Sequence, residues 1–144
     1  MAYSTIDDIR AYMPEEEILR LTDDEGLGVV VESRLESVIT SADAYIDAYC
    51  GTRYEVPVSP VPELLRSLSV DIAIYGLYSR MVAEMPEERA ERHRAAIWHL
   101  TEISKGTVSL GIPVLPNALK MVDGAKSSTE TDNKTFKRNT MEGY

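Results

Sequence analysis

Few side chains in this sequence could carry out chemistry, and their spacing argues against a shared reactive site. His93 and His99 are the two histidines, and they stand six positions apart on one predicted helix, so they point to different faces. Ligands for one metal ion must converge, so we interpret both as surface imidazoles and predict no metal site. Cys50 is the single cysteine and has no basic pair beside it. We therefore interpret it as a packed thiol and not as a nucleophile.

Other patterns that would indicate an enzyme are also missing. The acids at 15–17 and 23–25 lack the twelve-residue calcium loop with its central glycine, so they are typical of helix starts and turns. Gly26 and Gly28 are not followed by the lysine of a phosphate-binding loop. A small hydrolase would need a nucleophile beside its base, and the spacing provides neither. We therefore expect a protein that is not an enzyme, with no catalytic residue and no cofactor.

One carboxylate needs an explanation, because Asp71 lies in the middle of an otherwise apolar helix. A buried carboxylate costs several kcal/mol unless it is paired, so we predict a structural ion pair with Arg53, Arg66 or Arg34. Trp98 lies one position off the apolar face of its own helix. It either covers an edge of the domain or contacts a neighbouring subunit.

The elements that must position these residues are helices. The clearest is predicted over 31–50, where apolar residues recur at steps of three and four: Val31, Leu35, Val38, Ala42, Tyr45 and Tyr49. A second helix over 62–84 is apolar almost all round, so these two form the central pair. Short helices begin after Thr5 and at Pro14, and a last helix opens at Pro86. The fold class is therefore all-α, a small bundle of four to five helices.

The chain divides into three parts by composition. Residues 1–106 form the helical domain. Residues 107–119 are predicted to hold a short strand, because 107–110 alternate polar and apolar residues, followed by an extended segment rich in glycine and proline. Residues 120–144 are a polar arm that should be disordered alone in water. We predict that contact with a partner orders this arm, through Phe136, Lys137, Arg138, Met141 and Tyr144.

Charge is distributed unevenly along the sequence. Residues 1–119 carry 20 acids and 10 bases, whereas residues 120–144 carry 4 acids and 5 bases. Such an acidic body is a poor duplex-binding surface, although it does not exclude a protein that DNA must pass without binding. The alternative function, a small helical regulatory or DNA-binding protein, would need a basic recognition helix, and the helix over 87–105 is only balanced. No apolar run approaches the roughly 18 residues of a membrane span, so we expect no membrane contact.

Three segments, in this order and spacing, resemble one protein family. They are residues 3–9 (YSTIDDI) with 14–22 (PEEEILRLT), residues 44–57 (AYIDAYCGTRYEVP), and residues 71–78 (DIAIYGLY) with 97–106 (IWHLTEISKG). Together they resemble the phage Mu-type neck protein family, which is similar to the small helical head–tail connectors of long-tailed phages. The resemblance covers about residues 3–111. Cys50 departs from it, where an aliphatic residue is expected, and so does Gly76, where a bulkier residue is usual.

The resemblance implies a structural virion protein that is made in the host cytoplasm and located in the neck between capsid and tail. Such a connector, or adaptor, is a homo-oligomeric ring, expected to be twelve-fold, that docks under the portal protein. It extends the DNA channel and presents a surface to a head–tail stopper or tail terminator protein. DNA would pass through the lumen without specific binding. Asp71, Arg53, Tyr54 and Trp98 would have structural roles.

Overall fold

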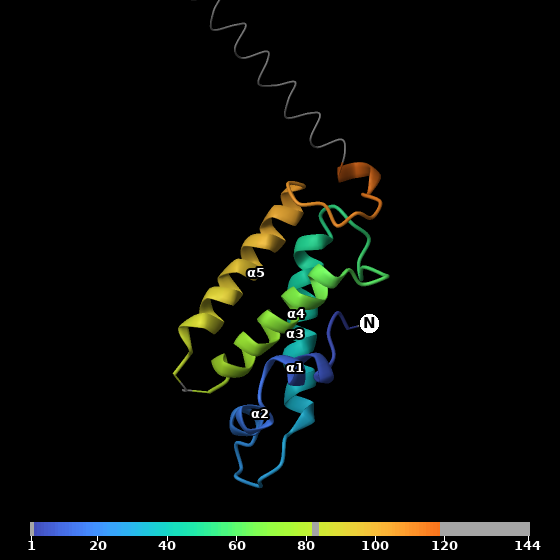
Figure 1. The fold of residues 1–144 in the computed structure, drawn as a ribbon. Coiled ribbons are helices and arrows are strands. Elements are labelled where there is room, and N and C mark those ends of the chain that lie inside the picture. The colour runs from blue at the N-terminus through green and yellow to red at the C-terminus, as the bar shows by residue number, and fades with distance from the viewer. Residues whose placement is uncertain (1, 82–83, 119–144) are drawn as a thin grey trace, which may run out of the picture.

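The computed structural model describes residues 2–81 and 84–118, and its described elements are helical (Figure 1). The helices are α1 (Ile6–Tyr12), α2 (Glu15–Thr22), α3 (Glu32–Cys50), α4 (Glu63–Ser79) and α5 (Glu87–Lys105). Residues 116–118 are helical as well. The predicted all-α class is confirmed for the described part of the chain.

Local sequence signals explain where these helices begin and end. At α1 the Thr5 hydroxyl accepts from the Asp8 backbone N–H at 3.2 Å, and the Asp8 carboxylate accepts from the Thr5 N–H at 2.8 Å, so the capping box is reciprocal. Prolines stand at the N-caps of α2, α4 and α5, where the missing N–H is harmless. Gly106 ends α5 in the left-handed conformation, with φ of 86°.

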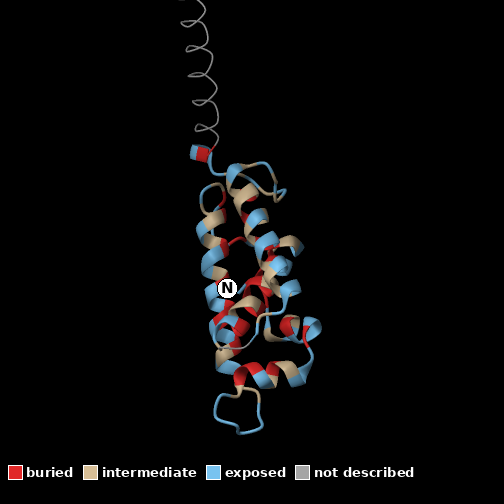
Figure 2. Ribbon diagram, turned by 90° about the vertical axis from the view of Figure 1, so that its left-hand side faces the viewer, coloured by how far each residue is buried: buried red, intermediate tan, exposed pale blue. Residues whose placement is uncertain are grey.

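The core lies between α3, α4 and α5, each of which packs against the other two. The two short helices α1 and α2 cover the lower halves of α3 and α4 in Figure 1. Buried residues line the inner sides of all five helices, and exposed residues cover the outer sides (Figure 2). Among the described helices, none combines the length and the apolar content needed to cross a membrane.

Two details of the predicted helices are wrong. The second central helix ends at Ser79 and not at residue 84, and Arg80 caps it by donating its backbone N–H to the Gly76 carbonyl at 3.2 Å. Tyr45 was expected on the apolar face of α3, but it is 54% exposed. The buried direction of α3 passes through Leu35, Ala42 and Ile46, and Tyr45 lies at its margin.

The predicted strand over 107–110 does not form. The backbone N–H groups of Thr107 and Val108 both donate to the Glu102 carbonyl, at 3.0 and 3.3 Å, so these residues close the end of α5. The Leu110 N–H then donates to the Tyr54 hydroxyl at 3.2 Å. The backbone groups that a strand would have paired with another strand are therefore engaged by a helix end and a side chain.

Candidate assembly interface

One end of the bundle presents two exposed apolar side chains on the loop between α2 and α3. Leu27 is 69% exposed and Val29 is 57% exposed. This loop lies at the lower end of the molecule in Figure 1, away from the core. Large side chains exposed together at an extremity are typical of contact surfaces. We name residues 26–29 the apolar tip.

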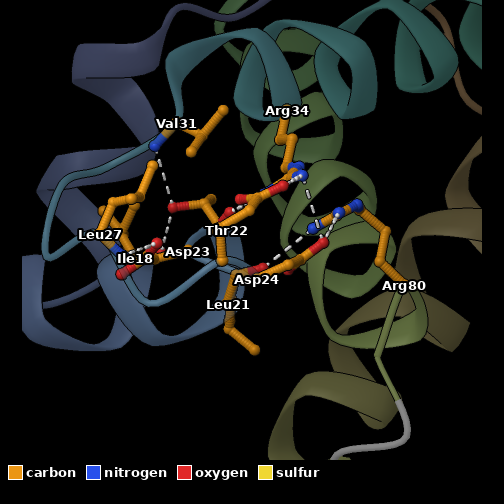
Figure 3. A network of polar contacts seen from close by, with 10 residues as sticks. Ile18, Leu21, Thr22, Asp23, Asp24, Leu27, Val31, Arg34 and Arg80 are labelled. Atoms are coloured by element: carbon orange, nitrogen blue, oxygen red, sulfur yellow. Dashed lines mark hydrogen bonds and ion pairs between the residues drawn. The ribbon is translucent and has the colours of Figure 1, made fainter.

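Polar contacts hold the apolar tip in one conformation (Figure 3). The Asp23 carboxylate accepts the backbone N–H groups of Leu27 and Gly28, both at 2.8 Å. These two bonds lower the pKa of Asp23, because they favour the charged carboxylate. The loop is therefore tied to the end of α2 by the residue that follows the helix.

Two arginines join the same loop to the main bundle. Arg34 of α3 donates to the Thr22 carbonyl and pairs with Glu25 at 2.8 Å. Arg80, which follows α4, donates to the Leu21 carbonyl at 2.9 Å and pairs with Asp24 at 3.0 Å. These contacts, which we name the arginine clamp, connect the end of α2 to both central helices (Figure 3).

Replacement of Arg34 by methionine is expected to lower the melting temperature and to loosen the apolar tip. The buried Thr22 would lose a donor to its carbonyl, and Glu25 would lose its partner. Melting curves and amide hydrogen exchange at Leu27 and Gly28 measure the two effects. The matched control is Arg66→Met, because Arg66 pairs with Glu63 at 3.7 Å on the exposed side of α4. Equal melting temperatures for the two variants would contradict a role for the clamp.

The opposite end of the bundle brings Arg53 and Tyr54 together with residues 110–115. The Tyr54 side chain is 1% exposed and accepts from the Leu110 N–H, while the Arg53 carbonyl accepts from the Leu115 N–H at 2.7 Å. The Arg53 guanidinium lies directly over Gly106. Arg53 and Tyr54, which follow α3, thus hold residues 110–115, which follow α5, in place.

A hollow of about 500 Å³ lies between these two segments. Its lining consists of Glu55, Val56, Pro57, Ser59, Pro60, Ile112 and Pro113. The loop below it is anchored, since Val58 is buried and its N–H donates to the Tyr3 hydroxyl at 2.9 Å. Tyr3 in turn donates to Asp47 at 2.5 Å, and its burial raises the pKa of that phenol. The hollow therefore has fixed walls.

Asp71 lies away from both ends, on the side of α4 that faces α5. Its side chain is 17% exposed, and its Oδ1 lies 3.9 Å from Arg92 Nη1. Burial raises the pKa of Asp71, and Arg92 opposes that shift. The predicted pairing with Arg53, Arg66 or Arg34 is wrong, because Asp71 lies on the side of α4 that faces α5, and Arg92 of α5 is the cation on that side.

The other singled-out residues are spread over the bundle. Trp98 is 57% exposed on the outer side of α5, and its ring makes an edge-to-face contact with the His99 ring, with centroids 5.0 Å apart. His93 stacks on Tyr75 of α4 with centroids 3.8 Å apart, and burial lowers its pKa. Cys50 is fully buried. In the described part of the chain, no group of three His, Cys, Asp or Glu side chains could hold a metal ion.

The predicted partner-binding residues lie outside the described residues: Phe136, Lys137, Arg138, Met141 and Tyr144. Sequence reasoning missed the apolar tip and the hollow. The sequence did contain a signal for the apolar tip. Residues 26–31 are all glycine or apolar and directly follow three acidic residues, and such an apolar run is unusual for an exposed turn. The hollow had none, because its two walls are more than 50 residues apart.

Comparison with known proteins gives one family. The model described as Bacteriophage Mu, Gp36 matches residues 3–128, which include all five helices. A relative from Haemophilus influenzae, named Mu-like prophage FluMu protein gp36, is 26% identical over 113 residues. These residues make up 78% of this chain and 77% of that protein.

Proposed function

The chain belongs to the bacteriophage Mu Gp36 family, and from this premise we propose that it is a structural virion protein, the head–tail connector of its phage. In this proposal it forms a homo-oligomeric ring, twelve-fold, under the portal protein, in the neck between capsid and tail. The ring extends the DNA channel and receives a stopper or tail terminator protein. It performs no enzymatic step. Family membership is the observation that carries the proposal.

The charge of the body supports a channel role. Residues 1–119 carry twice as many acids as bases, and the arginine clamp and several surface pairs already use part of the positive charge. A lumen lined by such a surface repels phosphate, so DNA slides through it without specific binding. The same charge disfavours the alternative of a DNA-binding regulator, which needs a basic surface.

The exposed apolar groups support assembly with other chains. The apolar tip lies at one end, and Trp98 lies on the outer side of α5. A chain that offers different contact groups on different sides can make heterologous contacts, and these close into rings when the rotation between copies allows it. The arm over 120–144 adds cations and apolar anchors, which suit an acidic groove on the portal or on a neighbouring body.

Deletion of residues 120–144 is expected to leave the helices intact and to weaken attachment to DNA-filled heads. The physical reason is that all described helices lie before the deleted segment, whereas the anchors Phe136, Met141 and Tyr144 lie within it. Co-sedimentation of the protein with purified heads measures attachment, and circular dichroism measures helix content.

Two further measurements keep the proposal open to refutation. The point change Phe136→Ser should weaken co-sedimentation, whereas Asn133→Ser, a polar change in the same arm, should not. Electron microscopy of the full chain mixed with portal protein should show an added ring. Full attachment without the arm would exclude a docking role for it. If no ring forms with the portal and the protein binds duplex DNA tightly and in a salt-sensitive way, the connector function is rejected in favour of the alternative, a DNA-binding regulator.

A further inference from the structure

The hollow at the upper end of the bundle is open, apolar in part, and formed before any ligand arrives. Val56, Pro57 and Pro60 form one wall, and Ile112 and Pro113 form the other. Both walls are anchored, the first through Val58 and Tyr3 and the second through the bond from Leu115 to Arg53. A volume of about 500 Å³ lies within the range of sites that bind small apolar groups.

The chain itself carries a group that fits this hollow. Phe136 is the single phenylalanine of the sequence, and it lies in the arm, outside the described bundle. Lys134, Lys137 and Arg138 lie within two residues of it in the sequence, and Glu55 is among the residues that line the hollow. An aromatic ring flanked in sequence by cations is complementary, in both polarity and charge, to a partly apolar hollow that contains a carboxylate.

The length of the arm matches the distance that it must cover. Pro113 lines the hollow, and Ala118 follows five residues later, so the two lie at most about 18 Å apart. Seventeen residues separate Ala118 from Phe136, and a chain of this length without regular structure would have a root-mean-square span of roughly 20–25 Å. A linker whose span matches the separation gives an effective concentration on the order of millimolar. The chain's own arm is thus the best placed occupant of the hollow.

We propose that, in the free subunit, the C-terminal arm folds back and places Phe136 in the hollow between residues 55–60 and 112–113. This inference stands on the hollow and the arm alone and does not depend on the connector role. It has a consequence for assembly, because a Phe136 ring that occupies the hollow cannot also anchor the arm on another protein. A partner that captures the arm must therefore displace it from the hollow.

The single phenylalanine makes the test direct. The full chain labelled with fluorophenylalanine gives one ¹⁹F resonance, and we expect it to be displaced from its position in the urea-denatured chain. Val56→Lys places a cation in the wall of the hollow, which opposes both the aromatic ring and the cations beside it, so it should return the resonance to the denatured position. The matched control is Val29→Lys, the same change at an exposed residue of the apolar tip, which should leave the displacement unchanged.

Each alternative has its own outcome. Circular dichroism establishes that both variants keep their helices, because Val56 and Val29 are both exposed at the surface. A resonance at the denatured position in the unmodified chain would overturn the proposal, and so would a displacement that Val56→Lys does not change. A displacement that disappears on tenfold dilution would mean that the arm of a second copy fills the hollow, which also overturns it. Ring formation with the portal is measured separately and can succeed or fail independently.

Discussion

Replacement of Leu68 by alanine is expected to lower the free energy of unfolding by about 2–5 kcal/mol. Leu68 is 3% exposed and lies on α4, the helix that contacts α1, α2, α3 and α5. Truncation removes its buried methyl groups and leaves a cavity that neighbours on several helices cannot all close. Urea unfolding, followed by circular dichroism, measures the change in the midpoint.

The matched control is Leu27→Ala, the same substitution at the apolar tip. Leu27 is 69% exposed, so its truncation should change the free energy of unfolding by no more than about 0.5 kcal/mol. The pair separates the role of a leucine in the core from its role at a surface. An equal loss in both variants would show that α4 is not the centre of the packed core.

Gly106→Ala is expected to destabilise the chain by more than the cost of the left-handed backbone alone. Gly106 has φ of 86°, which disfavours any residue with a Cβ by about 1–2 kcal/mol. A Cβ at this position would also clash with the Arg53 guanidinium, so the guanidinium must move. Arg53 as a whole is half-buried, but its Nε is buried, so the inner part of the side chain limits how far the guanidinium can move.

Gly28→Ala supplies the comparison for this second prediction. Gly28 has φ of 76°, but no atom lies within 4 Å of the position that a Cβ would take. Its substitution therefore measures the backbone cost without a clash. We expect Gly106→Ala to lose clearly more stability than Gly28→Ala in thermal and chemical unfolding. Equal losses would mean that Arg53 moves aside at no cost, and that its contact with the end of α5 contributes nothing.

Local signals in the sequence were sufficient to predict most of the helices. The capping box of Thr5 and Asp8, the prolines before α2 and α5, and the glycine after Lys105 each act within a few residues, so reading the chain in order finds them. The all-α class followed from the apolar spacing of α3 and α4. The departure at Gly76 has no explanation in the structure, since a Cβ there would lie 3.4 Å from Val38 of α3, which is ordinary van der Waals contact.

The contacts between distant segments could not be predicted in the same way. Asp71 had several arginines as possible partners, and the choice of Arg92 depends on which side of α5 faces α4. The strand over 107–110 had the right alternation, but the end of α5 and the Tyr54 hydroxyl engage its backbone. The arginine clamp joins residues up to 59 positions apart, and no local pattern encodes such a separation.

The buried thiol of Cys50 makes transient opening of the helical bundle measurable. Burial raises the pKa of Cys50 to about 11, so at neutral pH about one thiol in ten thousand is ionised, and the surrounding core keeps alkylating reagents away. Modification must then wait until α3 separates from its neighbours. When the maleimide is in enough excess to react at every opening, the rate at which it consumes the thiol in native buffer measures how often Cys50 becomes exposed, with no label added to the chain.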